Sequence, residues 1–133
     1  DTALLDMGDF VGGMLKYLRN NPVDRVTIAG GFAKLTKLAQ GFLDLHSGRS
    51  QVDFEWLAGA ARTAGADETV CAEILDANTA ADALSIAATA GIDLAAPVAR
   101  AARERAERVG TGHPLAVDVL VVDRSGRIIA HDG

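Results

Sequence analysis

The sequence predicts an α/β fold that is mostly helical, with a parallel sheet, flanking helices and a C-terminal β-hairpin. Apolar residues recur at helical spacing through much of the chain. A short β-branched segment, residues 25–29, stands between two such helical stretches, and this order is typical of a parallel sheet covered by helices. Near the end, two β-branched segments flank a short turn that contains glycine, which predicts a hairpin.

The first part of the chain predicts helix, strand and helix in succession. An amphipathic helix is expected from about residue 8 to 19, and Pro22 ends it because the residue before a proline avoids the helical region. Residues 25–29 follow as a buried strand, residues 31–43 as a helix, and residues 46–50 as a polar loop. The inward side chains of the second helix are expected to be Phe32, Leu35, Leu38, Ala39 and Phe42.

Two short helices and a capped third follow. They are expected near residues 52–63, 68–76 and 80–90. Thr79 is a favourable N-cap for the third of them, and Gly91 fits its C-terminal stop.

The last helix and the hairpin complete the chain. Asp93 is expected to cap this helix, with Pro97 tolerated in its first turn. Residues 115–122 and 127–130 are expected to pair around a turn at 123–126.

Composition limits the class of protein. The 133 residues fit a single domain, 1–133, and 49% are hydrophobic, enough for a core, while only 5% are aromatic, which favours closely packed helices of small residues. No apolar segment approaches the ~20 residues that cross a bilayer, so no membrane association is expected. A net charge of −5 without a basic stripe argues against nucleic acid as a partner.

Cys71 is the one cysteine of the sequence, so no internal disulfide can form. A reducing compartment, the cytoplasm, is therefore expected. The flanking residues Val70, Ile74 and Leu75 favour a small core residue at this position.

Gly30 and Gly31 stand where the predicted strand meets the predicted helix. Free N–H groups at the positive end of a helix form a site for an anion. We expect the Gly31 and Phe32 amides, with Lys34 or Lys37, to hold a carboxylate or phosphate. The residue order matches neither the dinucleotide fingerprint nor the P-loop. The alternative is a tight strand-to-helix connection with lysines on the surface.

His46 follows an apolar helical segment and begins a polar loop. A histidine at this place either stabilises the end of the helix or acts as a general base or ligand contact, because its pKa lies near neutral pH. Ser47 and Arg49 add donors to the same loop, and an arginine can bind a carboxylate with two parallel hydrogen bonds. A hydrolytic triad is not supported, because the G-x-S-x-G pattern is absent.

Metal binding is not expected. His46, His113 and His131 lie far apart and lack the spacing of a metal site. Asp9 belongs to the first predicted helix, where it either favours the helix dipole or faces a ligand.

Five segments together resemble one protein family. Residues 7–16 are similar to its G-D-F-V-G-x-M-L-K helix, residues 26–41 to its next strand and helix, and residues 44–47 to its x-T-H-S loop. Residues 77–79 and 121–127 fit as well. This combination, which spans nearly the whole chain, resembles the CbiD family of cobalt-precorrin-5B C1-methyltransferases in corrin biosynthesis. The chain departs from the family pattern at Gly13, Leu45 and residues 48–53.

The resemblance implies methyl transfer from S-adenosylmethionine to C1 of a cobalt-precorrin macrocycle. The family protein is longer, and an upstream half with a G-R-T-S-E segment is missing here. This chain is thus expected to be a C-terminal domain, inactive by itself, whose partners are that N-terminal half and the macrocycle. The hairpin edge and the alanine-rich helices are candidate surfaces for a homo-oligomer. The rival function is a non-catalytic domain that binds a small anion or a partner.

The resemblance also implies roles for named residues. His46 is the candidate base. The carboxylate of S-adenosylmethionine is expected on the amides of Gly30, Gly31 and Phe32, or carboxylates of the macrocycle are held by Lys34, Lys37 and Arg49. The full set of implied macrocycle contacts is Asp9, Lys34, Lys37, Ser47 and Arg49.

Overall fold

The computed structural model describes residues 2–5, 25–41, 52–109 and 116–133. The predicted helix at 8–19 and the loop at 46–50 lie outside these residues. In chain order the described elements are β1 (Thr2–Leu5), β2 (Arg25–Gly31), α2 (Phe32–Ala39), α3 (Phe54–Thr63), α4 (Glu68–Leu75), α5 (Ala80–Thr89), α6 (Ala95–Val109), β3 (Ala116–Val122) and β4 (Ile128–Asp132).

The strands form one sheet in the order β1-β2-β3-β4. β2 pairs in parallel with both β1 and β3, and β3 pairs antiparallel with β4. The predicted parallel sheet and C-terminal hairpin are therefore confirmed, and the hairpin makes the sheet a mixed one. β1 is a strand that the sequence analysis did not predict.

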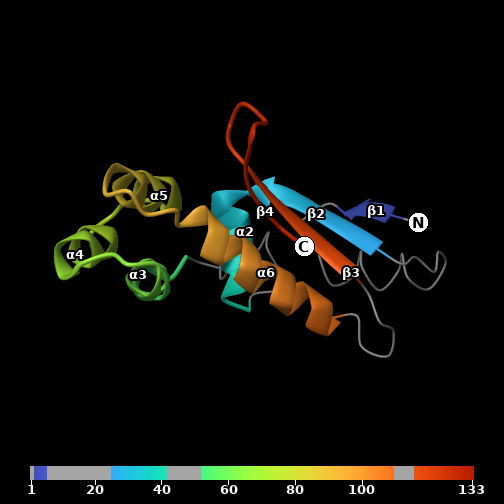
Figure 1. Ribbon diagram of the computed structural model, residues 1–133, viewed down its shortest axis with the longest axis horizontal. Helices are drawn as coiled ribbons and strands as arrows, with labels where there is room; N and C mark the ends of the chain where they lie inside the picture. The colour runs from blue at the N-terminus through green and yellow to red at the C-terminus, as the bar shows by residue number, and fades with distance from the viewer. Residues whose placement is uncertain (1, 6–24, 42–51, 110–115) are drawn as a thin grey trace.

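The helices are arranged in two groups (Figure 1). α2 and α6 pack on each other and against the strands, whereas α3, α4 and α5 gather at the end of the molecule away from the sheet. α5 also contacts α2, so it lies beside the start of that helix. The predicted mostly helical α/β class is confirmed.

One core cluster extends from the sheet through α2 and α6 to α3, α4 and α5. Alternate residues of β3 are buried, as expected for a strand with one covered face. α6 turns a row of small residues to this core, which confirms the expectation of closely packed helices drawn from the alanine content. The buried residues of these two elements are Ala95, Val98, Ala99, Ala102, Ala106, Val117, Val119 and Val121. Cys71 is also buried, as predicted.

Side-chain caps begin the helices of the second half. The Thr79 hydroxyl accepts a hydrogen bond from the Asp82 N–H at 3.0 Å, and the Asp93 carboxylate accepts one from the Ala96 N–H at 3.2 Å. Both caps were predicted. Gly91 has a φ of 79°, a left-handed conformation that suits glycine and ends α5 as expected.

Two predicted boundaries in the first half were wrong. The Gly-Gly pair is not a separate turn, because Gly30 and Gly31 pair with Val121 and Val122 and extend β2 to the start of α2. The helix predicted to reach residue 43 ends at Ala39. Gly41 takes a φ of 99° and donates its N–H to the carbonyl of Leu38, which closes the helix.

Candidate functional site

A cleft of about 630 Å³ opens where β2 and β3 end. The two strands are parallel, so their carboxyl ends meet at the same edge of the sheet. Ligands of open α/β sheets bind at this edge, and the volume is typical of a small-molecule site. The cleft is lined by Gly31, Phe32, Ala33, Ala81, Leu84, Ser85, Val122, Asp123, Arg124, Ser125 and Ile129.

The first turn of α2 forms one side of the cleft. Gly31 is the N-cap residue, with φ −72° and ψ 161°, and no side chain caps the helix there. Any residue can adopt this conformation, so backbone geometry does not require glycine. A Cβ atom at Gly31 would meet nothing within 4 Å. The missing side chain therefore leaves an open approach to backbone N–H groups that lack partners within the helix.

The structure brings only some of the predicted site residues into this cleft. Gly31 and Phe32 line it, whereas Gly30 pairs with β3 within the sheet. Lys34 is exposed and Lys37 lies in the last turn of α2; neither lines the cleft. The remaining predicted residues, Asp9, His46, Ser47 and Arg49, lie outside the described residues.

The turn between β3 and β4 forms the opposite side. The Asp123 carboxylate accepts hydrogen bonds from the Ser125 hydroxyl at 2.7 Å, the Ser125 N–H at 2.9 Å and the Arg127 N–H at 2.9 Å. These bonds, that of the Ser125 hydroxyl most of all, lower the pKa of Asp123. Gly126, with a φ of 85°, donates its N–H to the carbonyl of Asp123. The turn is thus held by its own hydrogen bonds.

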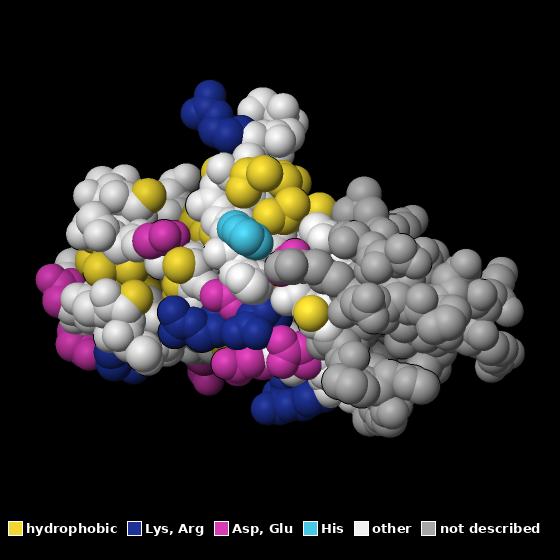
Figure 2. Space-filling view, turned by 45° about the vertical axis from the view of Figure 1, so that its right-hand side comes forward, with side chains coloured by type: hydrophobic (Ala, Val, Ile, Leu, Met, Phe, Trp, Pro, Cys, Tyr) yellow, Lys and Arg dark blue, Asp and Glu magenta, His cyan; other side chains and the backbone are white. Residues whose placement is uncertain are grey.

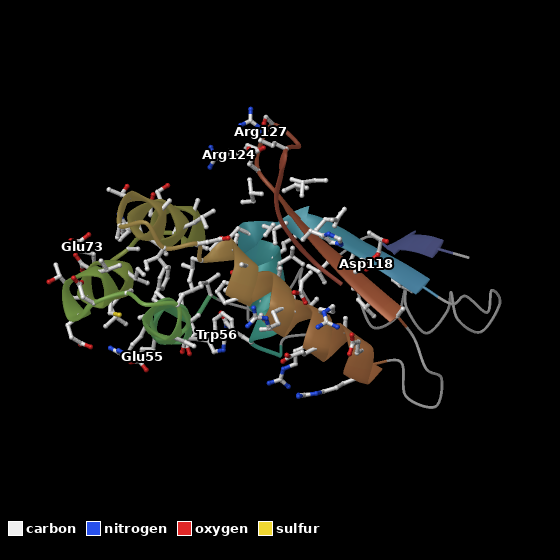
Figure 3. All side chains as sticks on the ribbon, viewed as in Figure 1. Glu55, Trp56, Glu73, Asp118, Arg124 and Arg127 are labelled. Atoms are coloured by element: carbon white, nitrogen blue, oxygen red, sulfur yellow. The ribbon has the colours of Figure 1, made fainter. Side chains whose placement is uncertain are left out.

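Arg124 is the basic side chain that this turn presents to the cleft. Figure 3 shows it reaching from the tip of the hairpin toward α5, whereas Arg127 points away from the body of the molecule. Arg124 is exposed, and none of the described residues forms an ion pair with it. Its guanidinium can therefore bind an anion in the cleft without first breaking an ion pair with a described residue.

The wall between these two sides is apolar. Phe32 is buried, and Leu84 and Ile129 are half-buried. An adjoining groove of about 420 Å³ shares Leu84 and Ile129, so the apolar surface continues past the cleft. Hydrophobic side chains also gather on the surface below the tip of the hairpin (Figure 2), and Ile128, which begins β4, is 56% exposed. The site suits a ligand with an apolar body and an anionic group.

Sequence reasoning missed the hairpin side of the cleft and the contribution of α5. The sequence predicts a turn at 123–126, within a segment of the family resemblance, and a helix at 80–90, but it points to no site role for either. The rule that parallel strands end at one edge could have pointed to Arg124, once β2 and β3 were known to be neighbours.

Within the four described ranges, no three His, Cys, Asp or Glu side chains are grouped so that they could hold a metal ion. Nor does any helix in those ranges have the length and apolar character to span a membrane.

Comparison with known proteins gives matches over nearly the whole chain. The family model described as CbiD, C-terminal domain, matches residues 44–133. A protein of Brucella anthropi named cobalt-precorrin-5B C(1)-methyltransferase is 57% identical over 130 residues, which cover 98% of this chain and 35% of that protein. A protein of Brucella ovis with the same name is 56% identical over the same share of both chains. The chain thus spans about a third of the length of these relatives. No solved structure gives a significant match.

Proposed function

Because the chain belongs to the CbiD C-terminal domain family, we propose that it forms one part of a methyltransferase that transfers a methyl group from S-adenosylmethionine to C1 of cobalt-precorrin-5B. The observation that carries the proposal is the 57% identity to a relative of that name over 98% of the chain. The rest of the enzyme is proposed to lie upstream, in the part of the relatives' length that this chain does not span. The isolated chain is expected to be inactive, and the buried, unpaired Cys71 is consistent with a cytoplasmic enzyme.

The start of α2 is the proposed place for the carboxylate of S-adenosylmethionine. The amides of Gly31 and Phe32 would hold it, and Gly30 would fix them by its pairing in the sheet. This fit is supported by the open space at Gly31 and by the absence of a side-chain cap on α2. Lys34 and Lys37 remain proposed contacts for carboxylates of the macrocycle, reached from outside the cleft.

Catalysis in such an enzyme depends mainly on positioning. Bound S-adenosylmethionine would supply a methyl group already activated by its sulfonium, so the protein must align the ligands and exclude water. Phe32 and Leu84 give the cleft an apolar wall for this purpose. His46 is proposed as the base that removes a proton from the substrate, with Asp9, Ser47 and Arg49 as further substrate contacts. A His46→Ala variant of the full-length protein that methylates at the normal rate would remove His46 from this role.

Calorimetric titration of S-adenosylhomocysteine tests the proposal. The ligand is titrated into this chain and, separately, into the full-length protein, which is this chain with its upstream part. Binding to both supports a cofactor site that includes α2. Binding to the full-length protein alone would place the site upstream, and binding to neither would contradict the assignment.

The rival function is a non-catalytic domain that binds a small anion. The same cleft supports it, because an apolar pocket with an arginine and a helix N-terminus suits any small carboxylate or phosphate. The two functions differ in the full-length protein, since only the methyltransferase turns over cobalt-precorrin-5B.

Sedimentation of the chain would test whether its hairpin edge or helices form a homo-oligomer.

A further inference from the structure

We propose that Arg124 binds a carboxylate side chain of the macrocycle and so sets the position of the macrocycle in the cleft. The inference rests on the proposed function and names the group of the substrate that this side of the cleft recognises. Arg124 would be a binding residue, opposite the α2 end where the cofactor carboxylate is proposed.

The first argument is the rigidity of the turn that carries Arg124. The Asp123 carboxylate accepts hydrogen bonds from the Ser125 hydroxyl and from the backbone N–H groups of Ser125 and Arg127, at 2.7 to 2.9 Å. The backbone of Asp123 and Arg127 is joined by a further bond of 2.9 Å. A guanidinium held on such a turn loses less conformational freedom when it binds than one on a loose loop.

The second argument is the charge that Arg124 faces. Asp123 is the one acidic side chain among the described residues that line the cleft, and its carboxylate is engaged within the turn. The two charges of the lining balance, but Asp123 is bonded within its own turn whereas Arg124 forms no ion pair with a described residue, so Arg124 is the charged group that a ligand can bind. S-adenosylmethionine carries a sulfonium and an ammonium, which Arg124 would repel, whereas the macrocycle carries several carboxylates. The planar fork of an arginine binds a carboxylate with two parallel hydrogen bonds.

The third argument is the apolar surface beside Arg124. Leu84 and Ile129 line both the cleft and the adjoining groove, so an apolar surface extends past the arginine. A macrocycle has a broad apolar body with acidic groups at its periphery. Such a ligand can lie on this surface and place one peripheral carboxylate at Arg124.

The test compares two arginines of the same turn in the full-length protein. Arg124→Gln removes the cleft charge, and Arg127→Gln removes an equal charge that does not line the cleft. Binding of cobalt-precorrin-5B without S-adenosylmethionine is followed by its absorbance spectrum, and binding of S-adenosylhomocysteine by calorimetry. Arg124→Gln should weaken macrocycle binding by about tenfold or more, the usual cost of a lost charged hydrogen bond. S-adenosylhomocysteine binding should stay within about twofold, the spread allowed for an indirect effect.

The control variant and the salt dependence complete the test. Arg127→Gln should leave both affinities unchanged, and added salt should weaken macrocycle binding more in the wild type than in Arg124→Gln. Equal macrocycle affinity in Arg124→Gln and the wild type would overturn this inference but not the proposed function. The same holds if Arg124→Gln weakens only the binding of S-adenosylhomocysteine. If the wild-type protein neither binds nor methylates the macrocycle, the proposed function itself fails, and this inference with it.

Discussion

Replacing Gly31 with serine should make the protein more stable and its ligand site weaker. Gly31 occupies the N-cap of α2 in the extended conformation that serine also adopts there. A Cβ atom at this position would meet nothing within 4 Å, so the new side chain has room. Its hydroxyl can accept a hydrogen bond from the N–H of Ala33 or Lys34. The new side chain then occupies the open approach to the neighbouring Gly31 and Phe32 amides, which we assign to the cofactor carboxylate.

The size of the effect follows from two terms. A serine cap is better than glycine by a few tenths of a kcal/mol, roughly 0.3. Loss of glycine's freedom in the unfolded chain adds about 0.4–1 kcal/mol. Together they raise the free energy of unfolding by about 1 kcal/mol, and Tm by about 4 °C for a chain of this size. The serine side chain stands in the approach to the Gly31 and Phe32 amides and costs the ligand carboxylate a charged hydrogen bond, so the ligand affinity should fall by about tenfold or more.

Urea unfolding of the chain and titration of S-adenosylhomocysteine into the full-length protein measure both effects. Gly31→Ala is the matched control, because it adds the Cβ but no hydroxyl. Alanine is a poor N-cap, so this variant should change stability by less than about 0.5 kcal/mol. It should also bind more tightly than Gly31→Ser. A serine variant that is destabilised, or that binds as tightly as the wild type, would refute the reasoning.

Three further predictions concern stability. Ile74 is fully buried, so Ile74→Ala should lower the free energy of unfolding by about 2–5 kcal/mol. Its neighbour Leu75 is 49% exposed, so Leu75→Ala should lower it by less than about 1 kcal/mol. Urea unfolding measures both values. Asp123 has a pKa lowered by its hydrogen bonds, so its stabilising effect is present above the unfolded pKa of about 3.8 and is lost as pH falls through the lower folded value. Urea unfolding between about pH 5 and pH 2 should therefore show a shallower loss of stability in Asp123→Asn, and equal slopes would contradict this. Arg103 forms an ion pair with Asp132 that joins α6 to β4. A double-mutant cycle with Arg103→Gln and Asp132→Asn should give a coupling free energy of about 1 kcal/mol. A coupling near zero would show that the pair does not contribute to stability.

Features set by neighbouring residues could be predicted from the sequence. Thr79 and Asp93 cap their helices, and Gly91 ends α5, because each acts on backbone groups within a few residues. The hairpin turn at 123–126 was likewise local. The buried place of Cys71 followed from the apolar residues around it.

Features set by strand pairing could not be predicted in this way. β1 spans only residues 2–5, too few for a periodic pattern to stand out. Gly30 and Gly31 resemble a turn in isolation and become strand only because β3 supplies Val121 and Val122 as partners. Local propensity is overridden by tertiary contacts in such cases.

One side of the candidate site depends on local sequence and the other on strand pairing. Its α2 side could be predicted, because a strand, glycines and a helix follow one another in the chain. The position of Arg124 opposite Gly31 depends on the register between β2 and β3, which no short segment reveals. Lys34 and Lys37 were placed at the site by their nearness in sequence, but the helix carries both away from the cleft lining.

Mass spectrometry of the macrocycle tests the central claim, that this cleft belongs to the active site of a methyltransferase. The full-length protein is incubated with cobalt-precorrin-5B and S-adenosylmethionine, and the wild type is compared with Gly31→Ser. We expect the wild type to yield a product one methyl group heavier, and the variant to form it about tenfold more slowly at limiting cofactor. No methylated product from the wild type, or an equal rate in the stably folded variant, would contradict the claim.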